Sequence, residues 1–403
     1  MANRRLRLVL AGGFCAVLAV ATWTPASAVP LFARKYGFNC TMCHSNFPRL
    51  NDYGWRYRLN GYQLPGQEDN EKTVLESGAP FAARTSAGYN YDKFENTPDA
   101  EDVNQFQING LDLLSAGVLG RNMSYLVVYP PHISASSGVV GQEGTLESAN
   151  LVFANLGGSR WLNVRAGRFE PLYVAFSSKR ALSVSPYEIY DFSPPRGVAF
   201  SDNQDGIEVY GWGRNGFEYA AGWLNGSGTN KQSDTASDFY VRAAKVFGRG
   251  EGWTVGQRVG LVGYWGKARP EGQPEAERQS LSRYGIDASL NYGHCNLALE
   301  WLKGNDDRSL WADAPADVDW RGGFAELTYM PAYDHVGFLR YDKVDTPAWA
   351  NADVSRWTIG WRYYPQDQLA LHLEWSRRTQ DAGPEGGCSA TERFLTARLD
   401  FAF

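Results

Sequence analysis

From residue 81 onward, apolar and polar side chains alternate with a period of two over runs of about ten residues. Between residues 284 and 292, Tyr, Ile, Ala, Leu and Tyr occupy every second position, with Gly, Asp, Ser and Asn between them. Leu369, Leu371, Leu373 and Trp375 repeat the pattern. Helical periodicity is absent. This alternation predicts β-strands with one apolar and one polar face.

The connections between these runs alternate between short and long. Short turns are expected at 157–158, 213–216, 248–252, 293, 331–334 and 365–367, and long polar loops at 171–203, 226–238, 266–282, 303–319, 342–355 and 376–391. Fitted to this pattern, strands begin near residues 81, 103, 122, 146, 161, 204, 217, 238, 253, 281, 296, 320, 335, 355, 368 and 392. These sixteen strands predict an all-β fold, a transmembrane antiparallel β-barrel with both ends on the side of the short turns. In outer-membrane barrels that side is the periplasm.

Three further features bear on this fold class. No later stretch is a continuous apolar run of about twenty residues, which excludes a transmembrane helix. Mean hydropathy is negative, as expected for strands that are apolar on one face only. The last strand stays apolar on one face up to Phe403, which resembles the signal that outer-membrane barrels present to their insertion machinery. A soluble β-sandwich or propeller, the alternative, would not need the uneven loop distribution.

The N-terminus has the pattern of a secretory signal. Arg4, Arg5 and Arg7 precede an apolar run from residue 8 to 23, and A-S-A at 26–28 supplies small residues for cleavage. We therefore expect residues 1–28 to be removed. Without the three arginines, 36 basic side chains face 44 acidic ones, and the net charge of about −8 argues against a nucleic-acid partner.

The strongest chemical signal is C-T-M-C-H at residues 40–44. In a C-x-x-C-H pattern the two thiols bond covalently to a c-type haem and the histidine binds its iron. Export agrees with this, because haem is attached outside the cytoplasm. A thioredoxin-like pair would need a βαβ context, and a zinc site would need two more ligands, none of which lies before His132. We predict one covalent haem c on Cys40 and Cys43, with His44 as axial ligand.

Residues 29–80 are predicted to form a small, mainly irregular and helical cytochrome segment, here called the plug, and residues 81–403 the barrel. Within the plug, residues 52–60 are expected to be one helix. Arg34, Arg49, Arg56 and Arg58 are available to meet the haem propionates. About fifty residues is too few for a self-sufficient core, so we expect the plug to lean on the rest of the chain.

Several stretches of the plug resemble the fused monohaem cytochrome–porins of iron-oxidising bacteria. They are V-P-L-F-A-R-K-Y-G-F-N-C-T-M-C-H at 29–44, F-P-R-L-N at 47–51, Gly54, and N-G-Y at 60–62. The likeness is specific over residues 29–65 and only architectural across the barrel. It implies an outer-membrane Fe(II) oxidase, with extracellular Fe(II) as donor and a periplasmic cytochrome or other small electron carrier as acceptor.

The membrane constrains how such a protein works. The hydrocarbon core of a bilayer is about 30 Å thick, so an isolated periplasmic haem would not reach an external donor. The barrel must bring donor and haem together, with the plug docked into or against the lumen. Because the plug directly precedes the first strand, we expect it at the periplasmic mouth, with iron approaching through the long loops.

One long loop is a candidate for iron approach. It carries Asp306, Asp307, Asp313, Asp317 and Asp319, and carboxylates suit a hard divalent cation. The alternative is that an acidic external loop is simply solvated.

The plug offers no sixth iron ligand of the usual kind, because its only Met is Met42, in the attachment loop, and its only His is His44. Strand parity places Met330 at the periplasmic rim of the lumen and His372 further up, which makes both candidates. Alternatively, Met330 is a rim methionine and His372 a lumen histidine, and neither binds iron. The iron would then be five-coordinate, or bound by water, a lysine or a backbone amine.

Cys295 falls in a predicted periplasmic turn and Cys388 in an external loop, so they are not expected to pair and neither is assigned a role.

Two other functions stay open at this point. One is a porin whose haem plug gates or senses. The other is an electron conduit for a different donor, such as reduced sulfur or a solid surface.

Overall fold

The structure, a computed structural model, describes residues 31–403 apart from 67, 69–70, 78–79, 98–99, 132–143, 145, 193–198, 227–237, 249–255, 269–277, 312–314, 348–352 and 382–388. The predicted signal, Asp313 and Cys388 lie outside the described residues. Within the described part, no helix has the length and apolar character needed to cross a membrane.

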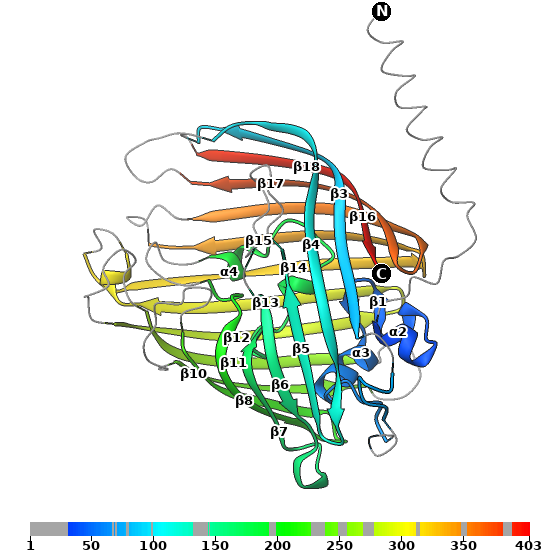
Figure 1. The fold of residues 1–403 in the computed structure, drawn as a ribbon. Coiled ribbons are helices and arrows are strands. Elements are labelled where there is room, and N and C mark those ends of the chain that lie inside the picture. The colour runs from blue at the N-terminus through cyan, green and yellow to red at the C-terminus, as the bar shows by residue number, and fades with distance from the viewer. Residues whose placement is uncertain are drawn as a thin grey trace, which may run out of the picture.

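The described residues form sixteen antiparallel strands that close into a barrel (Figure 1). They are β3 (Phe81–Glu95), β4 (Val103–Gly120), β5 (Met123–Tyr129), β6 (Ser148–Phe153), β7 (Asn163–Phe169), β8 (Gln204–Trp212), β9 (Phe217–Leu224), β10 (Asp238–Phe247), β11 (Gln257–Ala268), β12 (Gln279–Tyr292), β13 (Cys295–Asp306), β14 (Val318–Ala332), β15 (His335–Asp345), β16 (Val354–Gln366), β17 (Leu369–Gln380) and β18 (Ala390–Ala402). Neighbours in sequence pair, and β18 pairs with β3 to close the ring. The predicted fold class and strand number are confirmed. Every strand begins within two residues of its predicted start except β11, expected near 253 and found at Gln257.

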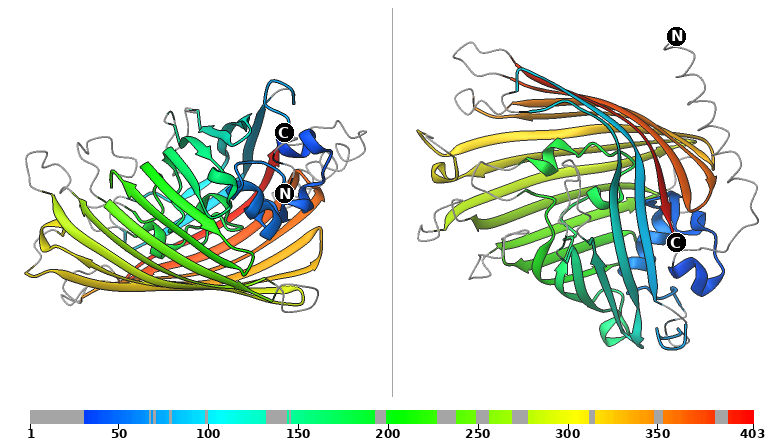
Figure 2. Two further views of the ribbon diagram at one scale, coloured as in Figure 1. Left: turned by 90° about the horizontal axis from the view of Figure 1, so that it is seen from below. Right: turned by 45° about the horizontal axis from the view of Figure 1, so that its top comes forward.

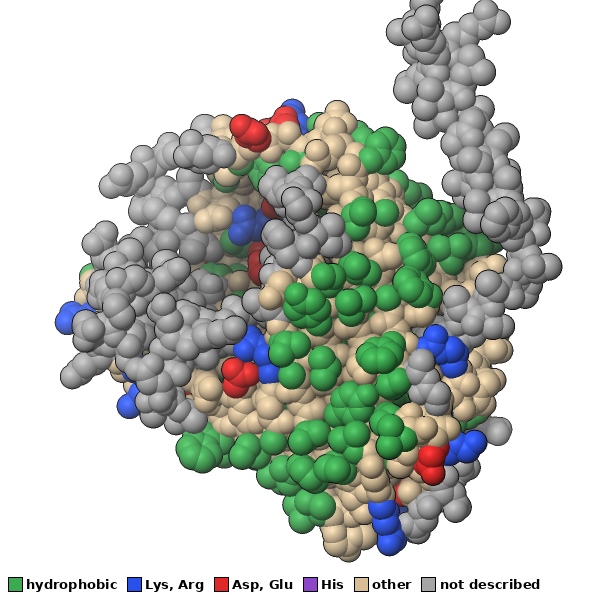
Figure 3. All heavy atoms as spheres, viewed as in Figure 1, with side chains coloured by type: hydrophobic (Ala, Val, Ile, Leu, Met, Phe, Trp, Pro, Cys, Tyr) green, Lys and Arg blue, Asp and Glu red, His purple; other side chains and the backbone are tan. Residues whose placement is uncertain are grey.

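The two faces of the barrel wall differ as the alternation predicts. On β17, Leu371, Leu373 and Trp375 are exposed on the outer face, whereas His372 and Glu374 are buried on the inner face. Figure 3 shows hydrophobic side chains gathered into a broad field on the outer wall, with charged side chains near its margins. An apolar outside and a polar inside suit a lipid bilayer.

Short turns, such as 293–294 and 333–334, join the strands at one end of the barrel, here called the short-turn end. Most connections at the opposite end, the long-loop end, are longer. Figures 1 and 2 place the plug (blue) close to the C-terminus. Since β18 finishes beside the turn before β17, the plug lies at the short-turn end.

The plug contains short elements joined by irregular chain. They are α2 (Leu31–Tyr36), the 3-10 turn η1 (Cys40–Met42), the paired strands β1 (His44–Asn46) and β2 (Arg49–Leu50), and α3 (Asp52–Leu59). The predicted helix at 52–60 is confirmed by α3. It begins there because the side-chain oxygen of Asn51 caps it, accepting a hydrogen bond of 2.9 Å from the Gly54 amide.

The plug docks into the lumen through polar contacts with the barrel wall. Arg49 forms an ion pair with the buried Glu326 and donates to the Thr328 hydroxyl at 3.0 Å. The Tyr364 hydroxyl donates to the Phe47 carbonyl at 2.5 Å. These contacts lie on the inner faces of β14 and β16. The plug therefore packs against the barrel, as expected for a segment too small to form a core of its own.

The connection between β7 and β8 was expected to be a polar external loop, and for residues 170–192 that expectation is wrong. This stretch, here called the lumen loop, folds inside the barrel and carries η4 (Ser178–Arg180) and α4 (Glu188–Asp191). Leu182, Tyr187, Ile189 and Tyr190 are fully buried. Arg340 of β15 donates to backbone carbonyls of the loop at 2.8 and 2.6 Å. The loop is rich in apolar and aromatic residues, and their burial drives it into the lumen.

The Arg49–Glu326 pair yields a stability prediction. Arg49→Met removes one partner of a buried ion pair and should weaken plug docking by about 3 kcal/mol. Limited proteolysis should cleave the plug faster than in the wild type. As a control, Arg56→Met removes a pair with the exposed Asp52 and one at 3.5 Å with Glu218, so it should have a much smaller effect. Equal cleavage of all three proteins would contradict the docking role.

Candidate haem site

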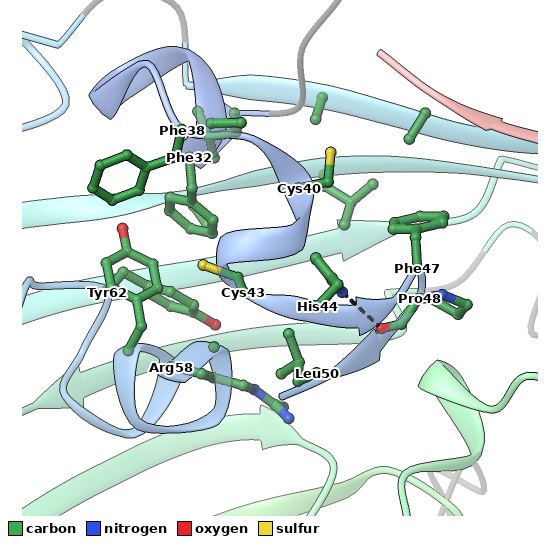
Figure 4. A pocket seen from close by; sticks show the side chains of 18 of the residues that line it. Phe32, Phe38, Cys40, Cys43, His44, Phe47, Pro48, Leu50, Arg58 and Tyr62 are labelled. Atoms are coloured by element: carbon green, nitrogen blue, oxygen red, sulfur yellow. Dashed lines mark hydrogen bonds between the residues drawn. The ribbon is translucent and has the colours of Figure 1, made fainter. Parts of the chain in front are cut away.

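A cavity of about 250 Å³ lies between the plug and the barrel wall, and Cys40, Cys43 and His44 all line it (Figure 4). Most of its other walls are apolar. From the plug they include Leu31, Phe32, Phe38, Leu50, Tyr57, Tyr62 and Leu64, and from β3–β5 Ala83, Leu114, Ala116, Leu126 and Val128. The motif therefore faces a largely apolar space that plug and barrel build together.

Asn51 and Gly54 hold the attachment loop against α3. The Asn51 side chain donates to the carbonyls of Thr41 and Met42, and the backbone N–H of Asn51 donates to the Cys43 carbonyl at 2.9 Å. Gly54 allows this close approach, because a Cβ there would lie 2.1 Å from the Cys43 carbonyl oxygen. The start of α3 thus fixes the backbone of residues 41–43.

The His44 ring is oriented by a backbone carbonyl. Its Nδ1 lies 3.2 Å from the Pro48 carbonyl oxygen (dashed in Figure 4). If Nδ1 carries the proton it donates there, which leaves Nε2 as the free metal-binding nitrogen. Burial lowers the pKa of His44 to about 4, so the ring is neutral at neutral pH. A neutral, oriented imidazole is the form that binds iron.

Cys40 and Cys43 are free and partly exposed. Burial raises the pKa of the Cys40 thiol to about 11, with a smaller contribution from Asp367, and burial also raises the pKa of Cys43. Thiol pairs that exchange disulfides have lowered pKa values, because the thiolate is the reactive form. The electrostatics of the site therefore disfavour the thioredoxin-like alternative.

Two arginines add positive charge to the cavity. Arg58 of the plug and Arg180 of the lumen loop both line it, and both face the carboxylate of Glu170, at 3.6 and 2.8 Å. Burial, with Arg180 nearby, lowers the pKa of Arg58 to about 10. Two guanidinium groups sharing one carboxylate leave a net positive charge, which suits a further anionic group.

These residues fit a c-type haem. The chain offers two thiols, an imidazole with a free nitrogen, apolar walls for a porphyrin, and cations for its carboxylates. Of the four arginines proposed for the propionates, Arg58 lines the cavity, whereas Arg34, Arg49 and Arg56 contact other groups. Among the described residues, no group of three or more His, Cys, Asp or Glu side chains is arranged to hold a metal ion.

The aspartates proposed for iron approach do not converge. Asp306 is buried and pairs with Arg283. Asp307 caps η5 (Arg308–Leu310), and Asp317 accepts from the Arg308 amide at 3.1 Å. Asp319 accepts from the Asn305 side chain at 3.0 Å.

Neither proposed sixth ligand is among the described residues that line the cavity. His372 is buried on β17, with Nε2 3.2 Å from Glu374 and Nδ1 3.6 Å from Asp400. Met330 packs against a cluster made by Leu182, Val336, Phe338, Tyr364 and Ala370. Parity placed both correctly on the inner face, but neither side chain lines the cavity that His44 faces.

Sequence reasoning missed the barrel side of the site. Arg180, Glu170, Leu126 and Val128 lie far from the motif along the chain, and no local pattern marks them as neighbours of Cys43. The apolar composition of residues 171–192 was the available signal, since a solvated loop does not need so many aromatic residues.

Comparison with solved structures places the barrel among known folds. The chain resembles the anion-selective porin from Comamonas acidovorans, at 15% identity and a TM-score of 0.59 over 80% of this chain and 99% of that one. This is the sixteen-stranded porin fold. The outer membrane channel DcaP of Acinetobacter baumannii gives a TM-score of 0.59 at 9% identity, covering 80% of this chain and 96% of that one. Pseudomonas putida OprB gives 0.56 at 10%, covering 84% and 97%.

The chain matches no protein-family model, and no curated protein matches its sequence. The structural likeness covers the fold alone. The interpretation of the plug and of its cysteines therefore depends on the residues of this chain and not on these comparisons.

The role of Gly54 can be tested by adding one methyl group. Gly54→Ala should force α3 away from the attachment loop and lower the fraction of purified protein that carries covalent haem, read from the intact mass. Gly110→Ala is the matched control, because a Cβ at Gly110 meets nothing within 4 Å. Full haem loading of Gly54→Ala would show that the close approach is not required.

The axial ligand set can be tested at the two barrel candidates. Because neither side chain lines the cavity, Met330→Ala and His372→Ala should leave the spin state and midpoint potential of the predicted haem unchanged. Optical spectra of both oxidation states, with a redox titration, measure this. A low-spin to high-spin change in one variant alone would assign that residue as the sixth ligand.

Proposed function

We propose that this protein is an outer-membrane Fe(II) oxidase that passes electrons through one covalent haem c to a periplasmic carrier. The observation that carries the proposal is the C-x-x-C-H motif facing an apolar cavity, with both thiols and the imidazole on its lining. The likeness of residues 29–65 to the cytochrome–porins of iron-oxidising bacteria supports Fe(II) as the donor.

The chain's own residues have defined tasks in this proposal. Cys40 and Cys43 hold the haem covalently, and His44 binds its iron through Nε2. Arg58 and Arg180 meet the haem carboxylates. The bound haem supplies a one-electron redox couple, and the apolar walls exclude water from it and so influence its potential.

The position of the plug suits transfer across the membrane. The attachment loop lies at the short-turn end, where Thr41 and Met42 are exposed. This is the periplasmic end in outer-membrane barrels, so a periplasmic cytochrome or another small carrier would dock there. Extracellular Fe(II) would meet the long-loop end. The other partners are the lipid bilayer and the barrel-insertion machinery, and nucleic acid is not among them.

A second candidate is a porin whose haem plug gates or senses, and the porin fold favours it. The buried lumen loop and the docked plug weigh against it, because they fill space that a solute would need. A gating porin would change its conductance with haem oxidation state without being reduced by Fe(II). A conduit for another external donor would be reduced by that donor instead.

The proposal predicts two linked results. The intact mass of the denatured wild-type protein should include one haem, and Cys40→Ala with Cys43→Ala should lose that increment. Anaerobic Fe(II) added to purified, oxidised protein should then produce the spectrum of reduced c-type haem.

Cys295→Ala is the control, since this cysteine lies on β13 and not at the cavity. It should retain both properties. Haem released from the wild type by acid–acetone would refute covalent attachment. Covalent haem that Fe(II) fails to reduce would refute the oxidase function and leave the gating porin or another donor.

A further inference from the structure

A series of aromatic side chains runs through the lumen from the aspartate-bearing loop to the plug. Its members come from that loop, from β14 and from the lumen loop: Trp311, Trp320, Phe192, Tyr190, Tyr187 and Phe324. All are buried except Phe192, which is partly buried. The rings form two contacting groups, Trp311 and Trp320 with Phe192, and Tyr190 and Tyr187 with Phe324. The backbone of residues 190–192 joins the two groups.

The outer end of the series meets the acidic loop directly. The indole nitrogens of Trp311 and Trp320 donate to the same Asp306 carboxylate oxygen, at 3.3 and 2.8 Å. Both indole rings contact Phe192, with centroids 6.0 and 4.9 Å away. The next residue along the chain, Asp307, is only half-buried. The series therefore starts next to the carboxylates at the long-loop end.

The middle of the series follows α4. From Phe192 it continues along the chain to Tyr190, whose ring lies 5.5 Å from that of Tyr187. Phe324 bridges the two tyrosines, at 6.1 and 4.4 Å. The lumen loop thus contributes rings to both contacting groups, Phe192 to one and Tyr190 and Tyr187 to the other.

The inner end reaches the plug. The Tyr187 hydroxyl donates to Glu326 at 3.2 Å, and Arg49 forms an ion pair with the same carboxylate. Arg49 follows Pro48, whose carbonyl lies 3.2 Å from the His44 ring. A short polar bridge therefore joins the last aromatic ring to the proposed iron ligand.

We propose that this aromatic series is the route by which electrons cross the barrel, so that electrons and not iron ions pass through the lumen. The inference rests on the proposed function and specifies its path. One Fe(II) at the long-loop end becomes Fe(III), and the electron reduces the haem iron from ferric to ferrous. The rings bridge donor and acceptor and are not oxidised in the net reaction.

Two physical arguments favour this route. Electron tunnelling falls steeply with distance, and contacting π-systems couple donor and acceptor better than a gap or a water-filled channel does. A hydrated cation would have to shed water to enter a lumen packed with buried rings, and removing a charge from water is costly.

The test uses the full-length holoprotein in liposomes, with the long-loop end outside. Ferrous sulfate is added anaerobically and haem reduction is followed by stopped-flow absorbance. Tyr187→Leu and Phe192→Leu should each slow reduction by about an order of magnitude. Tyr187→Phe and Phe192→Tyr, which keep the ring, should restore most of the rate. Midpoint potential and spectrum should stay unchanged in the two Phe192 variants, because the Phe192 ring contacts Trp311 and Trp320 and has no part in docking the plug.

Tyr240→Leu is the matched control. Tyr240 is also a buried lumen tyrosine whose hydroxyl donates to a glutamate, but its ring contacts Tyr173, which is outside the series. It should reduce at the wild-type rate. The partly buried Phe192 gives a second variant if loss of Tyr187 impairs folding.

The possible results distinguish failure of the aromatic route from failure of the proposed oxidase function. Wild-type rates in folded Tyr187→Leu and Phe192→Leu would overturn the aromatic route, as would faster reduction, which would mean that iron enters an opened lumen. A wild-type protein without covalent haem, or with haem that Fe(II) does not reduce, would instead overturn the proposed function.

Discussion

A single buried carboxylate joins the three parts of the molecule. Glu326 lies on the inner face of β14 and is fully buried. It pairs with Arg49 of the plug, accepts from the Tyr187 hydroxyl of the lumen loop, and lies 3.8 Å from Arg340 of the wall. A buried charge is tolerated only when it is paired and hydrogen-bonded. Plug, loop and wall therefore have to take these positions together, and the cavity beside His44 depends on their doing so.

The filling of the barrel lumen follows from the same requirement, that every buried charge has a partner. A strand that is apolar outside and polar inside brings charged side chains into a confined lumen, where each needs a partner. Arg340, for example, pairs with Asp342 at 2.7 Å and also binds the lumen loop. The loop satisfies wall charges with its backbone carbonyls while its own apolar side chains pack against the plug. An open pore of the same diameter would have left these groups to water.

The sequence was informative where the signal is local or periodic. Alternation marked the strands, and Asn51 with the residues after it marked α3. The spacing of Cys40, Cys43 and His44 predicted that they share a site, and all three line one cavity. What it missed depends on packing between distant segments: the inward course of the lumen loop and the arrival of Arg180 at the cavity. Parity gives the face that a side chain occupies, but not which segment covers that face.

The shared wall of the cavity bears on how the protein is assembled. Leu114, Ala116, Leu126 and Val128 of the barrel cover apolar side chains that the plug cannot cover alone. Until β3, β4 and β5 are in place, Phe32 and its neighbours stay open to water, and such surfaces promote aggregation. A chain in transit to the membrane therefore exposes the apolar side chains of its N-terminal segment as well as those of its strands, and assembly of β3, β4 and β5 is the step that shelters the former.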